Sequence, residues 1–396
     1  MPDALQTGAS CGRRAVRGAV ALALTLPLYL GGTAALGGRA SGGGGAGDAA
    51  ISAGGRYVAF ASAASDLVAH DTNGVFDVFV RDRRRHTTER VSVGPAGAQA
   101  SGQSGLSAIS ANGRFVVLWS DASNLVAGDT NGVADVFVRD RLQRRTVRAS
   151  VGPDGKEFDT ESGAAAISAD GRFVAFSNEG DLYLHDLERG VTKLVGPGGM
   201  PALSSDGRYL AFDDGAGHVV VGDRTTGSTD MVSVDSAGAP LQGTAEVPTI
   251  SANGRYVAFL VVATITPPRP APALYVRDRS QRTTRLVATS VGNPAISADG
   301  RTIAFEGGKQ GGLQQVVVEN VVSGRSEVAS VSTRGGAANG PSFTGSGPLS
   351  FGGRFIAFVS AASNLVPGDD NHTSDAFVRD QQTQATTRVS GASHRP

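Results

Sequence analysis

The chain is poor in several residues on which many folds and sites depend. Cys11 is the only cysteine in 396 residues, so no disulfide can form within the chain. Lysine is nearly absent, and aromatic residues make up only 6% of the sequence. Lysine and arginine together number 36 and are matched by 36 acidic residues. This balance predicts no nucleic-acid partner, and it leaves membrane association only to an uncleaved N-terminal segment.

Catalytic signatures are missing as well. The sequence contains no HExxH motif, no closely spaced pair of histidines and no GxSxG nucleophile turn. Glycine is abundant, with 55 residues, but the glycines follow expected strand turns and make no credible phosphate loop. The sequence therefore favours a non-catalytic protein and leaves an enzyme open as the alternative.

The first forty residues have the layout of a secretory signal peptide. A start containing three arginines precedes the apolar stretch GAVALALTLPLYLGG, which is short for a membrane span. Small residues follow, with cleavage expected after Ala35 or Ala40. We therefore expect a signal peptide over residues 1–40, a Gly-rich linker over 41–48, and a mature protein in the periplasm, at the cell surface or outside the cell. The alternative is a retained N-terminal anchor with the linker as a flexible tether.

A motif similar to ISADGRFVAF then recurs seven times, and we number the repeats 1 to 7 in chain order. The copies begin at Ile51, Ile109, Ile167, Leu203, Ile250, Ile296 and Leu349. Repeats of roughly 40 to 50 residues are typical of propeller blades, each a sheet of four short strands. The sequence thus predicts an all-β fold for residues 49–396, a single seven-bladed β-propeller of four-stranded antiparallel blades, closed so that repeat 7 touches repeat 1.

Each part of the repeat predicts a local structure. The Asp-Gly or Asn-Gly pair, as at Asn112-Gly113, predicts a two-residue hairpin turn with positive φ at both positions. The apolar run after it, such as Val58-Ala59-Phe60, predicts a strand buried on both faces. A Thr-rich stretch with alternating polarity predicts an outer strand with one solvated face.

The motif S-x-D-G-R-h-h-A-F, followed by h-Y/F-V-x-D (h, apolar), resembles the TolB-type, WD40-like (PD40) β-propeller repeat. The resemblance covers about residues 48 to 396 and implies the propeller fold. It implies little about function, because that family includes periplasmic scaffolds, parts of enzymes and many exported proteins. The periplasmic protein that gives the family its name has an additional N-terminal α/β domain, for which this sequence has no room, so its envelope partners are not expected here.

One string occurs three times, as HDTNGVFDVFVRD at 70–82, GDTNGVADVFVRD at 128–140 and GDDNHTSDAFVRD at 368–380. These copies belong to repeats 1, 2 and 7, which a closed ring makes neighbours, and they extend the connection between the second and third strands. Their oxygen-bearing side chains are candidate calcium ligands: Asp71, Asn73, Asp77, Asp129, Asn131, Asp135, Asp369, Asn371 and Asp375. Calcium needs six to eight oxygens, however, and each loop offers about three side chains. The other interpretation is structural, since Asp and Asn shape turns by bonding to their own backbone.

A second recurring aspartate ends the string or its counterpart in six repeats. These residues are Asp82, Asp140, Asp186, Asp223, Asp278 and Asp380. A ring of carboxylates could suggest an ion site, but a repeated Asp more often closes a turn or forms a pair within its own blade. We expect the second role here.

The sequence therefore predicts an exported, non-catalytic TolB-like propeller. It would act as an interaction scaffold that binds a protein, peptide or glycan through the extended loops of blades 7, 1 and 2. Two alternatives are open: a propeller lyase or hydrolase with its site at the central channel mouth, and a calcium-stiffened surface protein. A channel mouth lined by Gly, Ser and Ala would weigh against the enzyme. The sequence predicts no cofactor beyond the candidate calcium and does not specify an oligomeric state.

Overall fold

The structure, a computed structural model, describes residues 46–263, 271–308 and 312–391. In these ranges the regular structure is β-strand except for one short 3-10 helix, η2 (Pro95–Gly97). None of the described residues belongs to a helix with the length and hydropathy of a membrane span. The expected signal peptide, residues 1–40, lies outside the described residues. The last residues of the expected linker, 46–48, already form the start of the first strand.

Every repeat folds as an antiparallel meander of four strands that pair in chain order. Repeats 1 and 7 share one eight-stranded sheet, with the order β28-β27-β26-β25-β1-β2-β3-β4. Its strands are β1 (Ala46–Ile51), β2 (Tyr57–Ser62), β3 (Asp77–Asp82), β4 (Thr87–Arg90), β25 (Ser342–Leu349), β26 (Phe355–Ser360), β27 (Asp375–Asp380) and β28 (Ala385–Arg388).

Repeats 2 to 6 form five separate four-stranded sheets. Their strands are β5 (Ser104–Ile109), β6 (Phe115–Ser120), β7 (Asp135–Asp140) and β8 (Arg145–Arg148); β9 (Ser162–Ile167), β10 (Phe173–Asn178), β11 (Asp181–Asp186) and β12 (Val191–Pro197); β13 (Gly199–Leu203), β14 (Tyr209–Asp213), β15 (Val219–Asp223) and β16 (Thr229–Met231); β17 (Thr244–Ile250), β18 (Tyr256–Val262), β19 (Ala273–Asp278) and β20 (Thr283–Thr289); β21 (Val291–Ile296), β22 (Thr302–Gly307), β23 (Gln315–Asn320) and β24 (Ser326–Val328).

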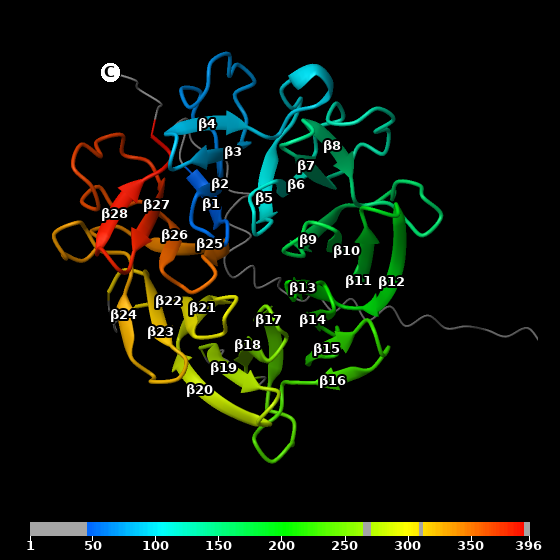
Figure 1. Ribbon diagram of the computed structural model, residues 1–396, viewed down its shortest axis with the longest axis vertical. Helices are drawn as coiled ribbons and strands as arrows, with labels where there is room; N and C mark the ends of the chain where they lie inside the picture. The colour runs from blue at the N-terminus through cyan, green and yellow to red at the C-terminus, as the bar shows by residue number, and fades with distance from the viewer. Residues whose placement is uncertain (1–45, 264–270, 309–311, 392–396) are drawn as a thin grey trace, which may run out of the picture.

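The sheets are arranged around a centre, with the first strand of each meander innermost and the fourth outermost (Figure 1). This confirms an all-β propeller with four-stranded antiparallel blades. The expectation of seven separate sheets is met only in part. Five are separate, whereas the first and last meanders merge because β1 and β25 run parallel and pair at Ala50 and Gly347.

Backbone hydrogen bonds link the Asp-Gly turns into a closed circle. In each link an N–H of one turn donates to a carbonyl of the next turn, at 2.8 to 3.1 Å. The links are Ala53 to Ala111, Ala111 to Ala169, Ala169 to Ser205, Ser205 to Ala252, Ala252 to Ala298, Asp299 to Phe351, and Phe351 back to Ala53. The first and last repeats are thus neighbours, as the sequence predicted.

The turn itself differs from the prediction of two positive φ angles. In repeat 2 the Gly113 N–H donates to the Ser110 carbonyl at 2.9 Å, so the turn starts two residues before Asn112. Only Gly113 has a positive φ, of 73°. Asn112 instead accepts hydrogen bonds through its Oδ1 from the Arg114 N–H and the Ser110 hydroxyl, both at 2.9 Å. The side chain therefore fixes the turn without an unusual backbone angle at Asn112.

The positive-φ glycine of each such turn also packs against the preceding repeat. A Cβ at Gly113 would overlap the ring of Tyr57. That ring lies between the guanidinium groups of Arg56 and Arg141, 4.7 and 4.4 Å from its centroid. Arg141 also donates to the Gly113 carbonyl. Three further rings each have two arginines beside them in the same way. Phe355 has Arg354 and Arg83, Phe173 has Arg172 and Arg224, and Tyr209 has Arg208 and Arg279.

The second strands supply more of the buried apolar core than the first, third or fourth strands. Val58, Ala59 and Phe60 are fully buried, as are their counterparts in repeats 3 and 5. Phe60 stacks on Phe79 of the next strand, with ring centroids 5.8 Å apart. The apolar run after each turn is therefore a strand buried on both faces, as predicted.

The junction between β1 and β25 is held by two carboxylates. Asp48 accepts hydrogen bonds from the N–H of Ser346, at 2.9 Å, and from its hydroxyl. Glu306 of repeat 6 accepts from the N–H and hydroxyl of Thr344, at 3.1 and 3.2 Å. Gly345 lies between these donors, where a Cβ would overlap the Ala49 carbonyl. Burial raises the pKa of Glu306 and raises that of Asp48 to about 6.

Candidate functional site

The three copies of the repeated string lie in the connections between the second and third strands of repeats 1, 2 and 7. Strand direction alternates within a meander, so these connections are at the end opposite the Asp-Gly turns, as predicted. Repeats 7 and 1 share a sheet and repeat 2 follows, so the loops occupy one arc of the ring (Figure 1). We call this surface, residues 63–76, 121–134 and 361–374, the rim.

An arginine of the fourth strand lies at the centre of each loop. In repeat 2, Arg148 contacts Asp129 at 2.9 Å and Asp135 at 3.4 Å, and also pairs with Glu157. The Arg148, Asp129 and Asp135 side chains are only 8%, 4% and 0% exposed. Asn131 donates through Nδ2 to Asp135 at 2.9 Å. The Arg148 guanidinium therefore offsets only part of the negative charge of these carboxylates.

The loop of repeat 1 has the same arrangement. Arg90 contacts Asp71 at 3.0 Å and Asp77 at 3.2 Å. Asn73 donates through Nδ2 to Asp77 at 2.8 Å, and the Ser92 hydroxyl donates to the other oxygen of Asp77. The carboxylate of Asp77 is thus fully engaged by side chains of its own repeat.

The loop of repeat 7 keeps the network despite its altered sequence. Arg388 contacts Asp369 at 3.0 Å and Asp375 at 3.4 Å, and Asn371 donates to Asp375 at 2.9 Å. His372 stands where the other loops have glycine and adopts a positive φ of 56°. The conformation of the loop therefore survives the loss of glycine, at some cost in backbone strain.

The first aspartate of each loop has a raised pKa. Burial raises the pKa of Asp71 and of Asp129, and the arginine beside each only partly offsets this. For Asp369, burial first and the Asp375 charge second raise the pKa to about 6. Weak acid near pH 6 therefore weakens the charge pairing inside the loop of repeat 7.

The structure brings each predicted trio of oxygen-bearing residues together, but with a guanidinium among them. The Asn side chains present Nδ2, a donor, to the second aspartate. Across residues 46–263, 271–308 and 312–391, no group of three or more His, Cys, Asp and Glu side chains could hold a metal ion. The calcium assignment stays a prediction, and the observed bonds favour the structural interpretation of the loops.

The central arginines were not singled out from the sequence, although a signal was there. The fourth-strand position of Arg90, Arg148 and Arg388 is arginine only in the three repeats that have the string. The other repeats have an exposed apolar residue there: Leu194, Met231, Leu286 and Val328. The co-occurrence of arginine with the two aspartates indicates an ion pair between strand and loop.

The loops are anchored below and linked sideways. Leu67, Leu125 and Leu365, one in each loop, are at most 2% exposed and therefore anchor the loops in the core. Asn124 of the second loop donates to the Gln99 carbonyl at 2.9 Å, in the connection that leaves repeat 1. In the third loop the Ser374 carbonyl accepts from the Ala46 N–H at 2.5 Å. The second and third loops are therefore each fastened to repeat 1.

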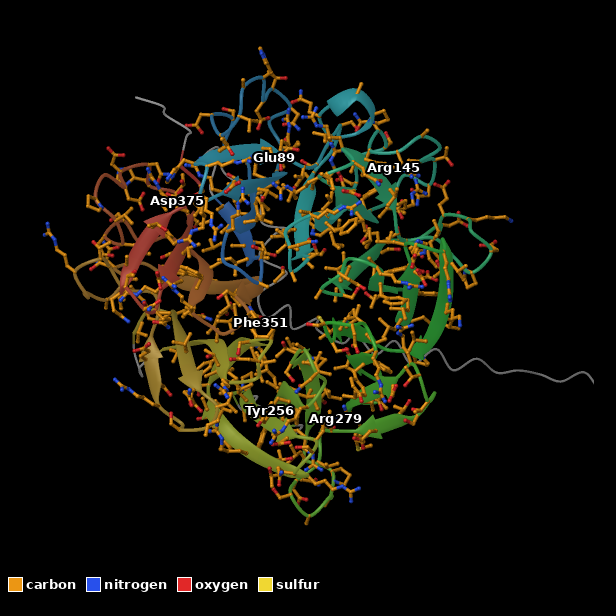
Figure 2. All side chains as sticks on the ribbon, in the orientation of Figure 1. Glu89, Arg145, Tyr256, Arg279, Phe351 and Asp375 are labelled. Carbon is orange, nitrogen blue, oxygen red and sulfur yellow. The ribbon has the colours of Figure 1, made fainter. Side chains whose placement is uncertain are left out.

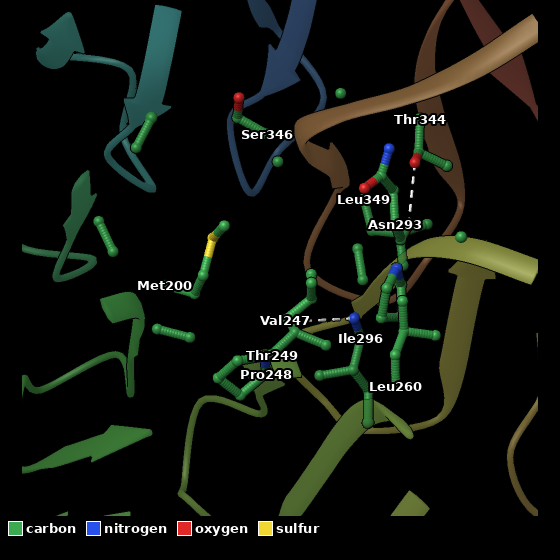
Figure 3. Close-up of a pocket in the computed structure, with 18 of the residues that line it drawn as sticks. Met200, Val247, Pro248, Thr249, Leu260, Asn293, Ile296, Thr344, Ser346 and Leu349 are labelled. Carbon is green, nitrogen blue, oxygen red and sulfur yellow. Dashed lines mark hydrogen bonds between the residues drawn. The ribbon is translucent and has the colours of Figure 1, made fainter. Parts of the chain in front are cut away.

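A cavity of 1580 Å³, which we call the channel, lies at the centre of the ring. Its described lining consists mainly of glycine, alanine, proline and aliphatic residues and contains no Lys, Arg or His. Figure 3 shows part of this wall, where the Ile296 N–H donates to Thr249 at 3.3 Å beside Val247, and Met200 lies apart from this bond. Such a lining offers no positively charged group to a substrate within the described residues.

Four carboxylates belong to the lining: Asp48, Asp213, Glu246 and Glu306. Asp48 and Glu306 hold the β1–β25 junction. Burial raises the pKa of Asp213, whose backbone partners include Gly215 and Gly199. The described part of the lining therefore contains no cluster of His, Glu and Arg.

The second recurring aspartate pairs within its own repeat, as predicted. Asp82 receives two parallel hydrogen bonds from Arg56, including Nε to Oδ1 at 3.0 Å and Nη2 to Oδ2 at 2.6 Å. Its Oδ1 also accepts from the N–H groups of Arg84 and Arg85 in the following turn. Five further pairs repeat this arrangement: Arg114–Asp140, Arg172–Asp186, Arg208–Asp223, Arg255–Asp278 and Arg354–Asp380.

Comparison with known proteins supports the fold and goes no further. No protein-family model and no curated protein matches the sequence. The propeller domain of the Trilobed protease from Pyrococcus furiosus, described as having an open velcro topology, is similar with a TM-score of 0.57 and 9% identity over 89% of this chain and 100% of that one. TolB from Acinetobacter baumannii has a TM-score of 0.44 and 13% identity, over 85% of this chain and 80% of that one. An oligogalacturonate lyase in complex with manganese has a TM-score of 0.47 and 12% identity, over 74% of this chain and 81% of that one. The chain is a β-propeller with distant structural similarity to TolB-type and other propellers.

Proposed function

We propose that the protein is an exported, non-catalytic propeller of seven blades that binds a protein, peptide or glycan through the rim. The observation that carries this proposal is the construction of the rim. Three neighbouring loops are each held in shape by an arginine between two buried aspartates. Rigid loops on a rigid scaffold lose little conformational entropy when a partner binds.

The count of seven treats the eight-stranded sheet as two blades joined at the closure. This is supported by the single residue pair that links β1 to β25, compared with five pairs between β1 and β2. It is also supported by the circle of turn-to-turn hydrogen bonds, which has one link for each repeat.

We propose export because of the sequence of residues 1–40. We propose that the protein is not catalytic because of the residues that line the channel. An oligogalacturonate is a polyanion, so a site for it would need cationic side chains, which the described channel lining lacks. Calcium stiffening of the rim is a weaker proposal, because each loop already holds a guanidinium. Thermal unfolding with and without a chelator tests it, and an unchanged midpoint rejects structural calcium.

A pull-down from the envelope fraction of the source cells tests the rim. Ala69 and Ala127 are exposed at equivalent places on the first two loops, so Ala69→Arg with Ala127→Arg changes the surface without touching the buried network. Gln382→Arg places the same charge at an exposed position in the β27–β28 turn, at the opposite end of the meanders. We expect the rim variant to lose partners that both the natural protein and the Gln382 variant retain. Equal capture by all three proteins rejects the rim as the binding surface.

A further inference from the structure

The net charge of zero conceals a local excess of arginine on the face opposite the rim. The β3–β4 turn of repeat 1 exposes Arg84 and Arg85, and the equivalent turn of repeat 2 leads into the exposed Arg144 and Arg145. None of these four guanidinium groups forms an ion pair with another described residue. The neighbouring aspartates, Asp82 among them, are buried and bonded to other arginines.

The two turns belong to one surface. Arg141, at the base of the second turn, pairs with Glu89 on β4 of repeat 1, and its guanidinium lies over the ring of Tyr57 of repeat 1. Figure 2 shows Glu89 and Arg145 on these two neighbouring repeats. Arg83 and Arg141 donate to the carbonyls of Gly55 and Gly113, so both turns are fastened to the Asp-Gly face. The only exposed carboxylate of these two hairpins, on Glu89, is already paired.

The corresponding turns of the other repeats lack this charge. Repeat 7 has glutamine and threonine at residues 381–384, and repeat 3 has adjacent opposite charges at Glu188 and Arg189. Repeats 5 and 6 each expose a single arginine, Arg282 and Arg325. The excess is therefore specific to repeats 1 and 2.

An exposed apolar side chain belongs to the second of these turns. Leu142, at the tip of the second turn, is 75% exposed and lies two residues before Arg144. A soluble anion gains nothing from such a leucine, whereas a bilayer offers anionic headgroups to the arginines and hydrocarbon to the leucine.

We propose that the surface formed by Arg84, Arg85, Leu142, Arg144 and Arg145 docks on anionic lipid membranes. The arginines contact the headgroups and Leu142 enters the interface. This leaves the rim facing away from the membrane, toward a partner in solution. The inference does not depend on the proposed function of the rim.

Flotation with vesicles tests the proposal on the full chain. We expect more protein on vesicles with 30% phosphatidylglycerol in phosphatidylcholine than on pure phosphatidylcholine, and a loss of this difference at 0.5 M NaCl. Each arginine near an anionic surface contributes roughly fivefold, so the fourfold variant with Arg84, Arg85, Arg144 and Arg145 changed to Gln should bind several-hundred-fold more weakly. The N-terminal segment is common to all variants, so its contribution cancels.

Two further variants make the result specific. Arg282→Gln with Arg325→Gln removes exposed arginines of other repeats and should leave binding unchanged. Leu142→Ser should weaken vesicle binding by roughly tenfold, since an apolar side chain no longer leaves water. It should not change binding to soluble dextran sulfate. Binding of the fourfold variant equal to that of the natural protein overturns the proposal, as does unchanged vesicle binding by the Leu142 variant. Equal thermal midpoints confirm that all variants are folded.

Discussion

Replacing Asp48 with asparagine should stabilise the protein at neutral pH and leave it unchanged in acid. Asp48 lies at the β1–β25 junction, where its carboxylate accepts from the N–H and hydroxyl of Ser346. Burial raises its pKa from 3.8 to about 6. The carboxamide of Asp48→Asn keeps an oxygen for the N–H and adds an NH₂ that can donate to the hydroxyl.

The size of the effect follows from proton linkage. The folded state holds a proton on Asp48 up to about pH 6, whereas the unfolded chain releases it near pH 3.8. Stability therefore falls as pH rises through this window, and above it the full cost of the buried charge is present. Each pKa unit corresponds to about 1.4 kcal/mol, so the limit is about 3 kcal/mol. Because Asp48 is partly accessible to solvent, we expect about 1 to 3 kcal/mol.

Thermal unfolding between pH 4 and pH 8 measures this difference. For a chain of this length 1 kcal/mol corresponds to roughly 1.5 °C, so the midpoint of Asp48→Asn should exceed that of the natural protein by roughly 2 to 4 °C at pH 8 and by almost nothing at pH 4. Asp66→Asn, which removes an exposed carboxylate from the first loop, supplies the baseline. A difference that does not change with pH, or a less stable Asp48 variant at pH 8, would refute the reasoning.

Two further predictions concern the turns and the rim. Gly113→Ala should destabilise the fold by about 2 to 3 kcal/mol, because the new Cβ combines backbone strain with a clash against Tyr57. Gly132 has a similar φ of 70° but nothing within 4 Å of a Cβ, so Gly132→Ala should cost only about 1 kcal/mol. Equal losses in urea unfolding would show that packing against Tyr57 is unimportant. Arg148→Met should cost about 3 to 5 kcal/mol at pH 7, since it leaves Asp129 and its partner carboxylate buried without a counter-charge. A loss below 1 kcal/mol in the same assay would contradict a buried ion pair that shapes the rim.

Much of the fold was predictable because the repeat encodes it locally. Each Asp-Gly or Asn-Gly pair marks a turn, the following apolar run marks a buried strand, and recurrence of the unit implies a ring. The turn type was wrong, however, because the pair alone does not show that Ser110 closes the turn and that only Gly113 carries the positive φ. That information lies in the serine two residues before Asn112.

Tertiary contacts were harder to predict. Residues 46–48 read as linker because small residues carry no strand pattern, yet they form a strand by pairing with β2 and adjoining β25. The rim arginines lie 13 to 19 residues after their aspartates, and only the comparison of all seven repeats reveals that the two occur together. The arginine patch is invisible in the net charge, since carboxylates elsewhere in the chain cancel it.

A designed disulfide across the junction tests most directly the central claim, that the first and last repeats meet. A Cβ at Gly347 would lie 3.3 Å from the Cβ of Ala50, close to the separation of about 3.8 Å typical of disulfides. In a Cys11→Ser background, Ala50→Cys with Gly347→Cys should therefore oxidise to an intramolecular disulfide in nearly every monomer, seen as faster migration on a non-reducing gel. Two free thiols in the folded, oxidised monomer would contradict a closed ring.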